Sequence, residues 1–393
     1  MIGNIKCLAQ DTKILMYDGT SKKIQDVING DAIMGENAQP VCVYKIENIK
    51  DIQYEVQPIR GENYIIGQNH NIILKASNYE MVWWDDKRKR FRARYMKDFM
   101  IYEKIFSLDK YGNKDIAEEE ANKFIKNIVG STKYGDEVII NIKKYYELSL
   151  RINTAYKCFS VGLNFKERNV IIDSYAIGYW LGDGTSAASQ ITTIEKEVID
   201  YFTNYAKSMD LELKKRSKYG YNITTGTQYG GARRNPFFNG LRKYNLVNNK
   251  HIPADYLFNS RENRLKLLAG IIDSDGSYNK NVYDICFKSE RLTDDVIFLA
   301  RSLGFFTYKK AVKKTCTNGK NGPVTGNYFR FCICGKSLED IPCLVPRKQA
   351  HIRESPKDAN VNGIKIKKLD IGNCYKIQLF NNSKIMLSNF TIV

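Results

Sequence analysis

The sequence predicts a multidomain protein in which an all-β domain is split by an inserted region of mixed helices and strands. Three observations predict this fold class. The chain has 393 residues, more than a single core of ordinary size accommodates. Short strands separated by turn residues fill about the first 85 and the last 30 residues. Helices alternate with strands over about 170–345, and a domain accepts such an insertion because its termini commonly lie close together.

Composition excludes several classes of protein. With 43% apolar and 26% charged residues the chain is not disordered, and no apolar run approaches the roughly 18 residues of a membrane span. Neither a membrane partner nor a signal peptide is expected. Nine cysteines without paired CxxC clusters indicate free thiols, so an intracellular location, in the cytoplasm or nucleus, is expected. A net charge of +18 with 26 tyrosines favours a polyanion as partner.

The strands of both ends are predicted from short runs rich in apolar residues that are separated by turn residues. At the front these runs are residues 12–17 (TKILMY), 23–27 (KIQDV) and 41–44 (VCVY). At the other end they are residues 363–366, 374–379 and 384–387, with a turn at Asn381-Asn382.

The region from about 86 to 150 is highly charged. It contains one predicted helix, residues 116–128, with an acidic first turn. Arginines alternate from position 88 to position 94, so an extended strand would place four guanidinium groups on one face, suited to phosphate or guanine. The alternative is an edge strand whose charges prevent aggregation. The candidate DNA contacts are Lys87, Arg88, Lys89, Arg90, Arg92 and Arg94.

An internal repeat lies in the mixed region. Residues 176–184 (AIGYWLGDG) match residues 268–276 (LAGIIDSDG) at an offset of 92, and the similarity continues downstream at an offset of 94. Each copy reads as a helix, strands and a second helix. Small residues four apart, such as Gly178 and Gly182, lie on one helix face and permit close approach of a partner helix.

Two acidic residues end the repeated helices. If the two helices pack on their small-residue faces, Asp183 and Asp275 emerge at the same end and repel each other unless a cation lies between them. Carboxylate oxygens favour Mg²⁺, which accepts phosphate oxygens and assists phosphodiester cleavage. Each aspartate precedes a glycine that is able to end its helix in the left-handed conformation. The alternative is that both Asp-Gly pairs are ordinary helix ends.

These two motifs resemble those of the LAGLIDADG homing endonucleases. The resemblance implies a pseudo-twofold αββαββα domain, here over 165–350, and metal-dependent double-strand cleavage of DNA at a long site, with Asp183 and Asp275 as catalytic metal ligands. It also implies a lysine before the second motif, for which Lys250 is the candidate, and a basic residue after the second repeat, for which Lys348 is preferred over Arg347. An ordinary solvated side chain is the alternative for each lysine.

The start of the chain resembles an intein, the Hint splicing fold. The run CLAQDTKILMYDG from Cys7 carries the resemblance, which implies that Cys7 attacks the preceding carbonyl to form a thioester. A histidine in a Thr-x-x-His pattern usually assists, and His70 takes that place while Gly67 replaces the threonine. A buried cysteine and a core histidine are the alternatives.

The end of the chain also resembles an intein. The expected final His-Asn pair is missing after Val393, and the upstream position that is often histidine holds Ser383, so complete splicing is not expected of the chain as given. The domains implied are an extein remnant over 1–6, a Hint domain over 7–85 and 351–393, and a DNA-recognition insertion over 86–150. That insertion occupies the place of the one in inteins of the yeast vacuolar-ATPase type.

The leading hypothesis is therefore an intein-type homing endonuclease. Its expected partners are double-stranded DNA with a long asymmetric target, the host protein exteins and Mg²⁺, and a monomer is expected. One alternative is an autoprocessing intein whose nuclease is inactive. Another is a nucleic-acid-binding protein that does not cleave and that shows salt-sensitive binding only.

Overall fold

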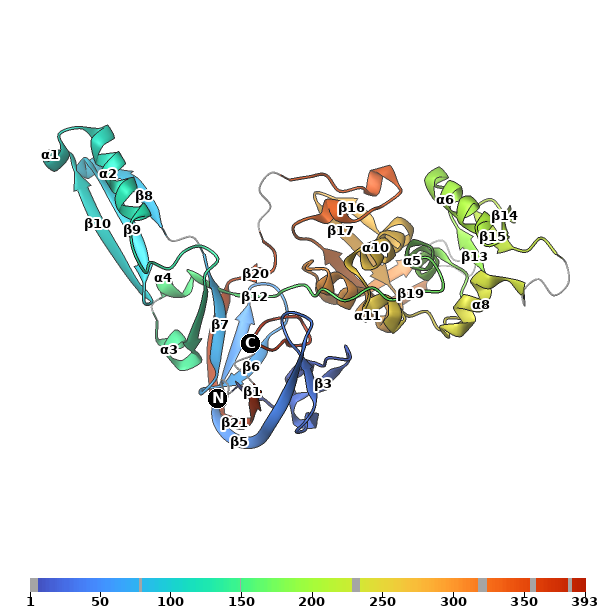
Figure 1. The fold of residues 1–393 in the computed structure, drawn as a ribbon, viewed down its shortest axis with the longest axis horizontal. Helices are drawn as coiled ribbons and strands as arrows, with labels where there is room; N and C mark the ends of the chain where they lie inside the picture. The colour runs from blue at the N-terminus through green and yellow to red at the C-terminus, as the bar shows by residue number, and fades with distance from the viewer. Residues whose placement is uncertain are drawn as a thin grey trace. The chain divides into compact units, whose positions relative to one another are not determined.

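The chain is a mixed α/β protein with several small antiparallel sheets. The computed structural model describes residues 6–77, 80–148, 150–227, 234–316, 324–353, 358–380 and 384–393. The chain divides into two compact units, the first made of Met1–Ser160 with Val361–Val393 and the second of Val161–Asn360 (Figure 1). Residues 1–5 of the expected extein remnant, the turn at Asn381-Asn382 and Ser383 lie outside the described residues.

The first unit consists mainly of strands. They are β1 (Lys6–Ala9), β2 (Lys13–Leu15), β3 (Ser21–Lys23), β4 (Ala32–Met34), β5 (Pro40–Pro58), β6 (Tyr64–Gly67), β7 (Asn71–Ala76), β8 (Met81–Asp85), β9 (Arg90–Lys97), β10 (Met100–Ser107), β11 (Glu137–Asn141), β12 (Tyr156–Phe159), β20 (Val361–Asn362) and β21 (Ile364–Leu379). Four helices accompany them: α1 (Leu108–Tyr111), α2 (Lys114–Lys126), α3 (Ile142–Glu147) and α4 (Leu150–Asn153).

Two long strands organise this unit. β5 has 19 residues and β21 has 16, and they pair along almost their whole lengths, with register shifts near Ile371 and Leu379. The expectation of separate short strands over 363–366 and 374–379 was wrong, because residues 367–373 stay within β21 and a register shift between Lys368 and Ile371 lets its pairing with β5 continue. The sheet has the order β21-β1-β6-β5-β4, so β1 is paired on both sides and Cys7 is buried.

The expected insertion over 86–150 divides differently in the structure. β11 pairs with β7, and β12 pairs with both β7 and β20, so residues 137–159 belong to the sheets of the surrounding β domain. The remaining part, β8 to α2, has its own three-stranded sheet, covered by α2 through a core that includes Phe91, Phe106 and Ala121. The helix expected over 116–128 begins two residues earlier, because Asn113 caps its first turn.

The second unit contains the repeat. Its helices are α5 (Ser174–Asp183), α6 (Lys196–Lys207), α8 (Pro236–Lys243), α9 (Ala254–Leu257), α10 (Arg261–Asp275) and α11 (Glu290–Ser302). Its strands are β13 (Gln190–Thr192), β14 (Glu212–Lys215), β15 (Gly220–Thr224), β16 (Ser277–Asn279), β17 (Val282–Phe287), β18 (Lys309–Cys316) and β19 (Val324–Ile333). One core connects both copies, built from side chains such as Trp180, Phe202, Leu268 and Val296.

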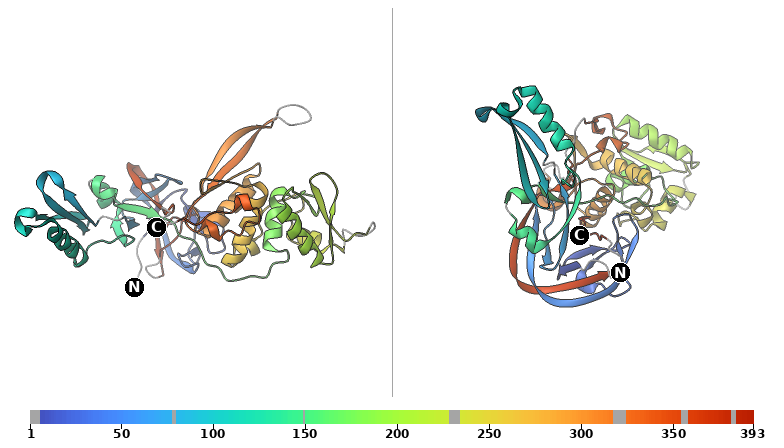
Figure 2. Two further views of the ribbon diagram at one scale, coloured as in Figure 1. Left: turned by 90° about the horizontal axis from the view of Figure 1, so that it is seen from above. Right: turned by 60° about the vertical axis from the view of Figure 1, so that its left-hand side comes forward.

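The two copies are related but unequal. The first has a three-stranded sheet, β13-β15-β14, and the second a four-stranded sheet, β16-β17-β19-β18. An isolated bridge between Gly184 and Ile191 stands where β16 pairs with β17 in the second copy. Among the described residues, the first copy therefore lacks one of the regular strands of the expected αββαββα pattern. In the second copy β18 and β19 form a long hairpin that projects from the rest of the unit (Figure 2).

Among the described residues, none of the helices is both long enough and apolar enough to cross a bilayer.

Candidate functional site

The helices α5 and α10 pack with their backbones in contact. A Cβ on Gly178 would overlap the carbonyl oxygen of Leu267, and one on Gly270 would lie 2.6 Å from the backbone nitrogen of Tyr179. Two side-chain-free positions therefore face each other, as the small-residue spacing predicts. This contact fixes the ends of the two helices side by side.

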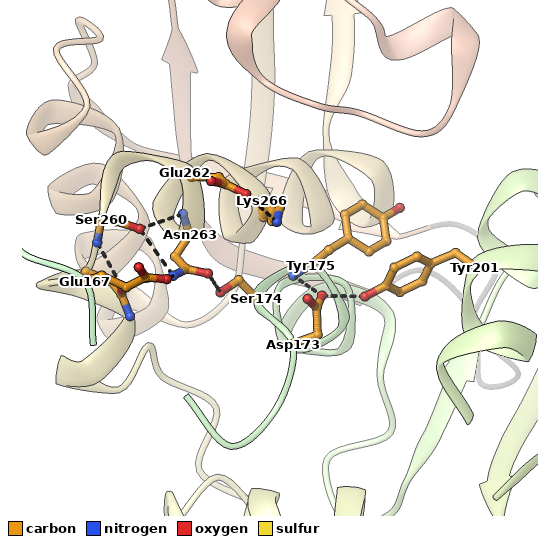
Figure 3. A network of polar contacts seen from close by, with 10 residues as sticks. Glu167, Asp173, Ser174, Tyr175, Tyr201, Ser260, Glu262, Asn263 and Lys266 are labelled. Atoms are coloured by element: carbon orange, nitrogen blue, oxygen red, sulfur yellow. Dashed lines mark hydrogen bonds and ion pairs between the residues drawn. The ribbon is translucent and has the colours of Figure 1, made fainter. Parts of the chain in front are cut away.

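Hydrogen bonds connect the N-terminal ends of α5 and α10, away from the two aspartates (Figure 3). Asp173 caps α5 by accepting hydrogen bonds from the backbone of Tyr175 at 2.8 Å and from the hydroxyl of Tyr201. Ser174 Oγ donates to Asn263 Oδ1 at 3.1 Å, which links α5 to α10 directly. The register of the helix pair is thus set at both ends.

The two expected carboxylates lie together at the C-terminal ends of this pair. A Cβ on Gly182 would lie 2.6 Å from Asp275 Oδ2, so the Asp275 carboxylate rests against the residue that precedes Asp183. Although solvent reaches Asp275, the protein around it desolvates its carboxyl group, and together with the charge of Asp183 this raises its pKa to about 6. Desolvation also raises the pKa of Asp183, against the opposing effect of Lys348 and Lys250.

The glycines after the aspartates do not adopt the expected left-handed conformation. Gly184 has φ −84° and ψ 149°, and Gly276 has φ −81° and ψ 152°, so both leave the helix as extended backbone. Glycine is needed there for space instead. A Cβ would overlap the indole ring of Trp180 in the first copy and lie 2.8 Å from the carbonyl of Ile272 in the second.

Each candidate lysine caps one helix of the pair. Lys250 Nζ donates to the carbonyls of Gly182 at 3.0 Å and Gly184 at 2.7 Å, at the end of α5. Lys348 Nζ donates to the carbonyls of Ile272 at 2.9 Å and Asp273 at 2.7 Å, at the end of α10. Carbonyls at the end of a helix carry the negative end of its dipole; among these four, Ile272 O also accepts the backbone N–H of Gly276 at 2.9 Å. The two lysines therefore occupy matching places beside the two carboxylates.

The pKa values of both lysines are lowered. Burial lowers the pKa of Lys250 to about 8, while the carboxylates of Asp275 and Asp183 oppose the shift. Burial also lowers the pKa of Lys348, which is 3% exposed. Arg347, the other basic residue at this place, pairs instead with Glu195. The geometry therefore supports the preference for Lys348 over Arg347, while its role stays a prediction.

Asp273 is a residue that the sequence motifs did not single out. It accepts hydrogen bonds on Oδ2 from Tyr175 Oη at 2.8 Å and from the backbone of Leu344 at 2.6 Å, while its buried Oδ1 has no hydrogen-bond partner in the described part of the chain. Asp273, Asp183 and Lys348 line an open hollow of about 400 Å³. A comparison of the two copies could have drawn attention to Asp273, because the matching position of the first copy holds the apolar residue Leu181.

The donor set at the helix ends fits a divalent cation. Mg²⁺ is usually bound by one or two carboxylates, with water and substrate oxygens completing its shell. Asp183 and Asp275 supply two such groups. Desolvation raises the pKa of both, and the charge of Asp183 adds to the shift of Asp275, so an ionised Asp275 is costly without a nearby cation. Within the described ranges no group of three His, Cys, Asp or Glu side chains gathers at one point, so the protein alone would leave part of that shell to other ligands.

The second candidate site surrounds Cys7. His70 Nδ1 lies 3.1 Å from both the backbone nitrogen and the carbonyl oxygen of Cys7, and both residues are fully buried. The ring accepts from the N–H when Nδ1 is unprotonated and donates to the carbonyl in the other tautomer. Burial lowers the pKa of His70 to about 3, with Lys6 adding to the shift, so the ring is neutral at pH 7. Its Nε2 has no hydrogen-bond partner among the described residues. The contact joins the expected nucleophile and the expected histidine across 63 residues of sequence.

The basic segment differs from its expectation. Arg90, Arg92 and Arg94 do lie on one face of β9, but Arg88 belongs to the 3₁₀ turn before the strand, with Lys89 in the left-handed region. The three strand arginines are also paired. Arg92 and Arg94 contact Glu103 on β10, at 2.6 and 3.2 Å, and Arg90 contacts Asp85 at 3.4 Å. The expected face of four free guanidinium groups is therefore absent from the described structure. Lys87, Arg88 and Lys89 are exposed, although Lys89 contacts Asp86 at 3.0 Å.

Comparison with known proteins places the whole chain in one family. Residues 7–393 match the family model described as Hom_end-associated Hint, in which a Hint domain accompanies a homing endonuclease. The chain belongs to this homing-endonuclease-associated Hint family.

Individual relatives cover smaller parts. The chain is 36% identical over 144 residues to the replicative DNA helicase DnaB of Mycobacterium intracellulare, a stretch of 36% of this chain and 21% of the helicase, so it spans about a fifth of that relative. Among solved structures, variants of the homing endonuclease I-DmoI share 11% identity, with 41% of this chain and 81% of theirs covered and a TM-score of 0.27. The gp41-1 intein shares 15% identity, with 34% and 84% covered and a TM-score of 0.16.

Proposed function

We propose that the protein is an intein-encoded, site-specific homing endonuclease that makes Mg²⁺-dependent double-strand breaks in DNA. The observation that carries this proposal is the pair of carboxylates, Asp183 and Asp275, at the shared end of two glycine-faced helices. Membership of a homing-endonuclease-associated family supports it. The enzyme acts inside the cell, in the cytoplasm or nucleus, on phosphodiester bonds.

Asp183 and Asp275 would hold the cation. When bound, Mg²⁺ supplies Lewis-acid activation of a phosphate oxygen and of water. The ammonium groups of Lys250 and Lys348 hold the helix-end carbonyls and place positive charge next to the carboxylates, where an incoming phosphodiester would be attracted. The lowered pKa of Lys250 also brings its ammonium near the range in which it exchanges a proton at neutral pH.

The substrate would be a long and asymmetric duplex. Both helices of the site belong to one chain, so a monomer supplies both carboxylates. The sheets of the two copies differ in strand number, and Asp273 in one copy replaces Leu181 in the other. Unequal halves would contact unequal half-sites. The exposed group Lys87, Arg88 and Lys89 would add contacts to the phosphate backbone.

A cleavage assay tests the nuclease. The protein is incubated with Mg²⁺ and a plasmid library that contains the uninterrupted host-gene junction, and we expect cutting at one site. Asp183→Asn and Asp275→Asn should reduce cutting at least ~100-fold at unchanged melting temperature. The matched control Asp200→Asn, on the exposed side of α6, should cut like the parent. Site-specific cutting that persists in both catalytic variants contradicts the assignment.

A second candidate function is autoprocessing at Cys7 with an inactive nuclease, favoured by the contact between Cys7 and His70. It predicts that added thiol or hydroxylamine releases residues 1–6 by an N–S acyl shift, seen as a loss of mass. The Cys7→Ala variant should keep its full mass. DNA cleavage by the same preparation would show that the nuclease is active as well.

A further inference from the structure

The thiol of Cys7 lies against a buried carboxylate that the sequence motifs do not include. Cys7 Sγ donates a hydrogen bond to Asp51 Oδ2 at a distance of 3.5 Å. Asp51 lies in the middle of β5, is 5% exposed, and comes to Cys7 from a position 44 residues away. The backbone of the nucleophile is thus contacted by His70, and its thiol by Asp51 and by the thiol of Cys374.

The surroundings hold this carboxylate in place. The backbone N–H of Ile52 donates to Asp51 Oδ1 at 2.9 Å, and the Asn69 side chain donates to Oδ2 at 3.4 Å. Asn69 immediately precedes His70, so the same turn orients both the histidine and the carboxylate. One oxygen therefore faces a backbone donor while the other is shared between Asn69 and the thiol.

Gly67 makes room for the arrangement. A Cβ at this position would overlap both Cys7 Sγ and Asp51 Oδ2. Any residue with a side chain, including the threonine of the Thr-x-x-His pattern, would displace the thiol, the carboxylate or both. The departure from the pattern at Gly67 and the presence of Asp51 are therefore two parts of one arrangement.

We propose that Asp51 is a catalytic residue of the acyl shift and acts as the general base for the thiol of Cys7, an inference that rests on the proposed autoprocessing at this cysteine. Asp51 accepts the thiol proton as Sγ attacks the carbonyl carbon of Lys6. The new S–C bond forms and the C–N bond between Lys6 and Cys7 breaks. The Cys7 nitrogen gains one proton, so the thiol proton passes overall to nitrogen, Asp51 is again ionised, and no other reactant is consumed.

The electrostatics disfavour a free thiolate at Cys7. The neighbouring thiol of Cys374, burial and the Asp51 charge together raise the pKa of Cys7, so solvent alone produces little thiolate at neutral pH. A thiolate next to an ionised Asp51 would suffer like-charge repulsion. Transfer of the proton to Asp51 as the thiolate forms leaves only one negative charge on the pair.

The test measures release of residues 1–6 from the full chain in hydroxylamine, followed by intact mass. Asp51→Asn should slow release roughly 100-fold, the usual contribution of a general base. Its rate should also rise about tenfold per pH unit from about pH 6 to 8, because hydroxide must now form the thiolate, whereas the parent rate should change little. Asp51→Glu, which keeps the base, should release faster than Asp51→Asn. Gly67→Ala should be as slow as Asp51→Asn.

Glu55→Gln is the matched control, because it makes the same change four residues along β5 at a carboxylate that binds Asn63 and Gln57 instead. It should release at the parent rate. Parent-like release and an unchanged pH profile in Asp51→Asn, with Cys7→Ala inactive, overturn the role of Asp51 alone. No release from the parent overturns the acyl shift itself, and the role of Asp51 with it.

Discussion

At the scale of single residues, the two carboxylates of the helix pair differ in their surroundings although the motifs that carry them are alike. Asp275 lies beside Gly182, and desolvation together with the charge of Asp183 raises its pKa to about 6. Its ordinary value of 3.8 applies in the unfolded chain. The folded state therefore binds this proton more tightly than the unfolded state does. That contribution to stability is complete below about pH 4 and is lost as the pH rises through about 6.

Divalent cations should reverse this loss. Above about pH 6 both carboxylates are ionised and repel each other, so Mg²⁺ should raise the melting temperature at about pH 8 and have little effect at about pH 5, where Asp275 holds a proton. Differential scanning fluorimetry with Mg²⁺ or with EDTA measures the difference. In Asp275→Asn the stabilisation by Mg²⁺ at the higher pH should largely disappear. Equal stabilisation by Mg²⁺ at both pH values would contradict a cation held by this pair.

Single residues also show how far a sequence predicts a site. Gly178 and Gly270 are predictable contacts because a repeated small-residue spacing on one helix face serves close helix packing. The interaction of Lys348 with the end of α10 is not predictable, because 75 positions separate it from Asp273 and no local pattern encodes that approach. Asp51 was missed for the same reason: Cys7 is 44 positions away, and Asp51 is one of several charged residues that lie between isoleucines in the middle of β5.

At the scale of elements, the contact between α5 and α10 depends on the absence of side chains. A Cβ on Gly270 would overlap the carbonyl oxygen of Tyr175 and crowd the nitrogen of Tyr179, both of which are backbone atoms that cannot rotate away. The helix pair must separate to accept even a methyl group, and with it the two carboxylates move apart.

Gly270→Ala should therefore destabilise the protein by about 2–3 kcal/mol and reduce cleavage more than stability alone explains. Alanine favours a helix over glycine, so a gain of about 1 kcal/mol would be expected if packing did not oppose it. Urea denaturation measures the change. Lys266→Ala, at an exposed ion pair of the same helix, is the control and should stay within about 0.5 kcal/mol of the parent. A stabilised Gly270→Ala would show that the helices are not in close contact.

The strand β9 shows a second limit of prediction from sequence patterns. Alternation correctly predicts that Arg90, Arg92 and Arg94 share a face, because a strand has a period of two. The acidic partner of two of them lies on the next strand, where pairing brings Glu103 opposite Arg94. Such cross-strand pairing follows from register, which the sequence alone leaves open. Of the six basic residues predicted to contact DNA, the exposed ones are Lys87, Arg88 and Lys89 in the preceding turn.

These two groups of basic residues should behave differently in DNA binding. Replacing Lys87, Arg88 and Lys89 with alanine should lower the slope of log Kd against log salt by about 2–3, because each lost phosphate contact removes about 0.9. Arg92→Ala should change that slope little and should mainly lower the melting temperature, since it leaves Glu103 with one partner fewer. Fluorescence anisotropy over a range of salt concentrations measures the slope for each variant. If Arg92→Ala lowered the salt-dependence slope as much as the triple variant does, the arginine face of β9 would also contact DNA.

At the scale of the whole molecule, each candidate site is contained within one compact unit. The carboxylates and lysines of the cation site all lie within Val161–Asn360. Cys7, Asp51, His70 and Cys374 all lie within Met1–Ser160 and Val361–Val393. The division of the chain was expected from strands at both ends and a repeat between them. Its boundaries were not, because residues 137–159 return to the first unit through strand pairing with β7.

Since neither site takes a residue from the other unit, the two activities should be separable by point substitution. Cys7→Ala should cut DNA at the parent rate and release no peptide. Asp275→Asn should release residues 1–6 at the parent rate and cut no DNA. Both assays are run on the same preparations, with melting temperatures measured to confirm folding. A folded Cys7→Ala that has lost DNA cleavage, or a folded Asp275→Asn that has lost peptide release, would show that the chemistry of one unit depends on the other.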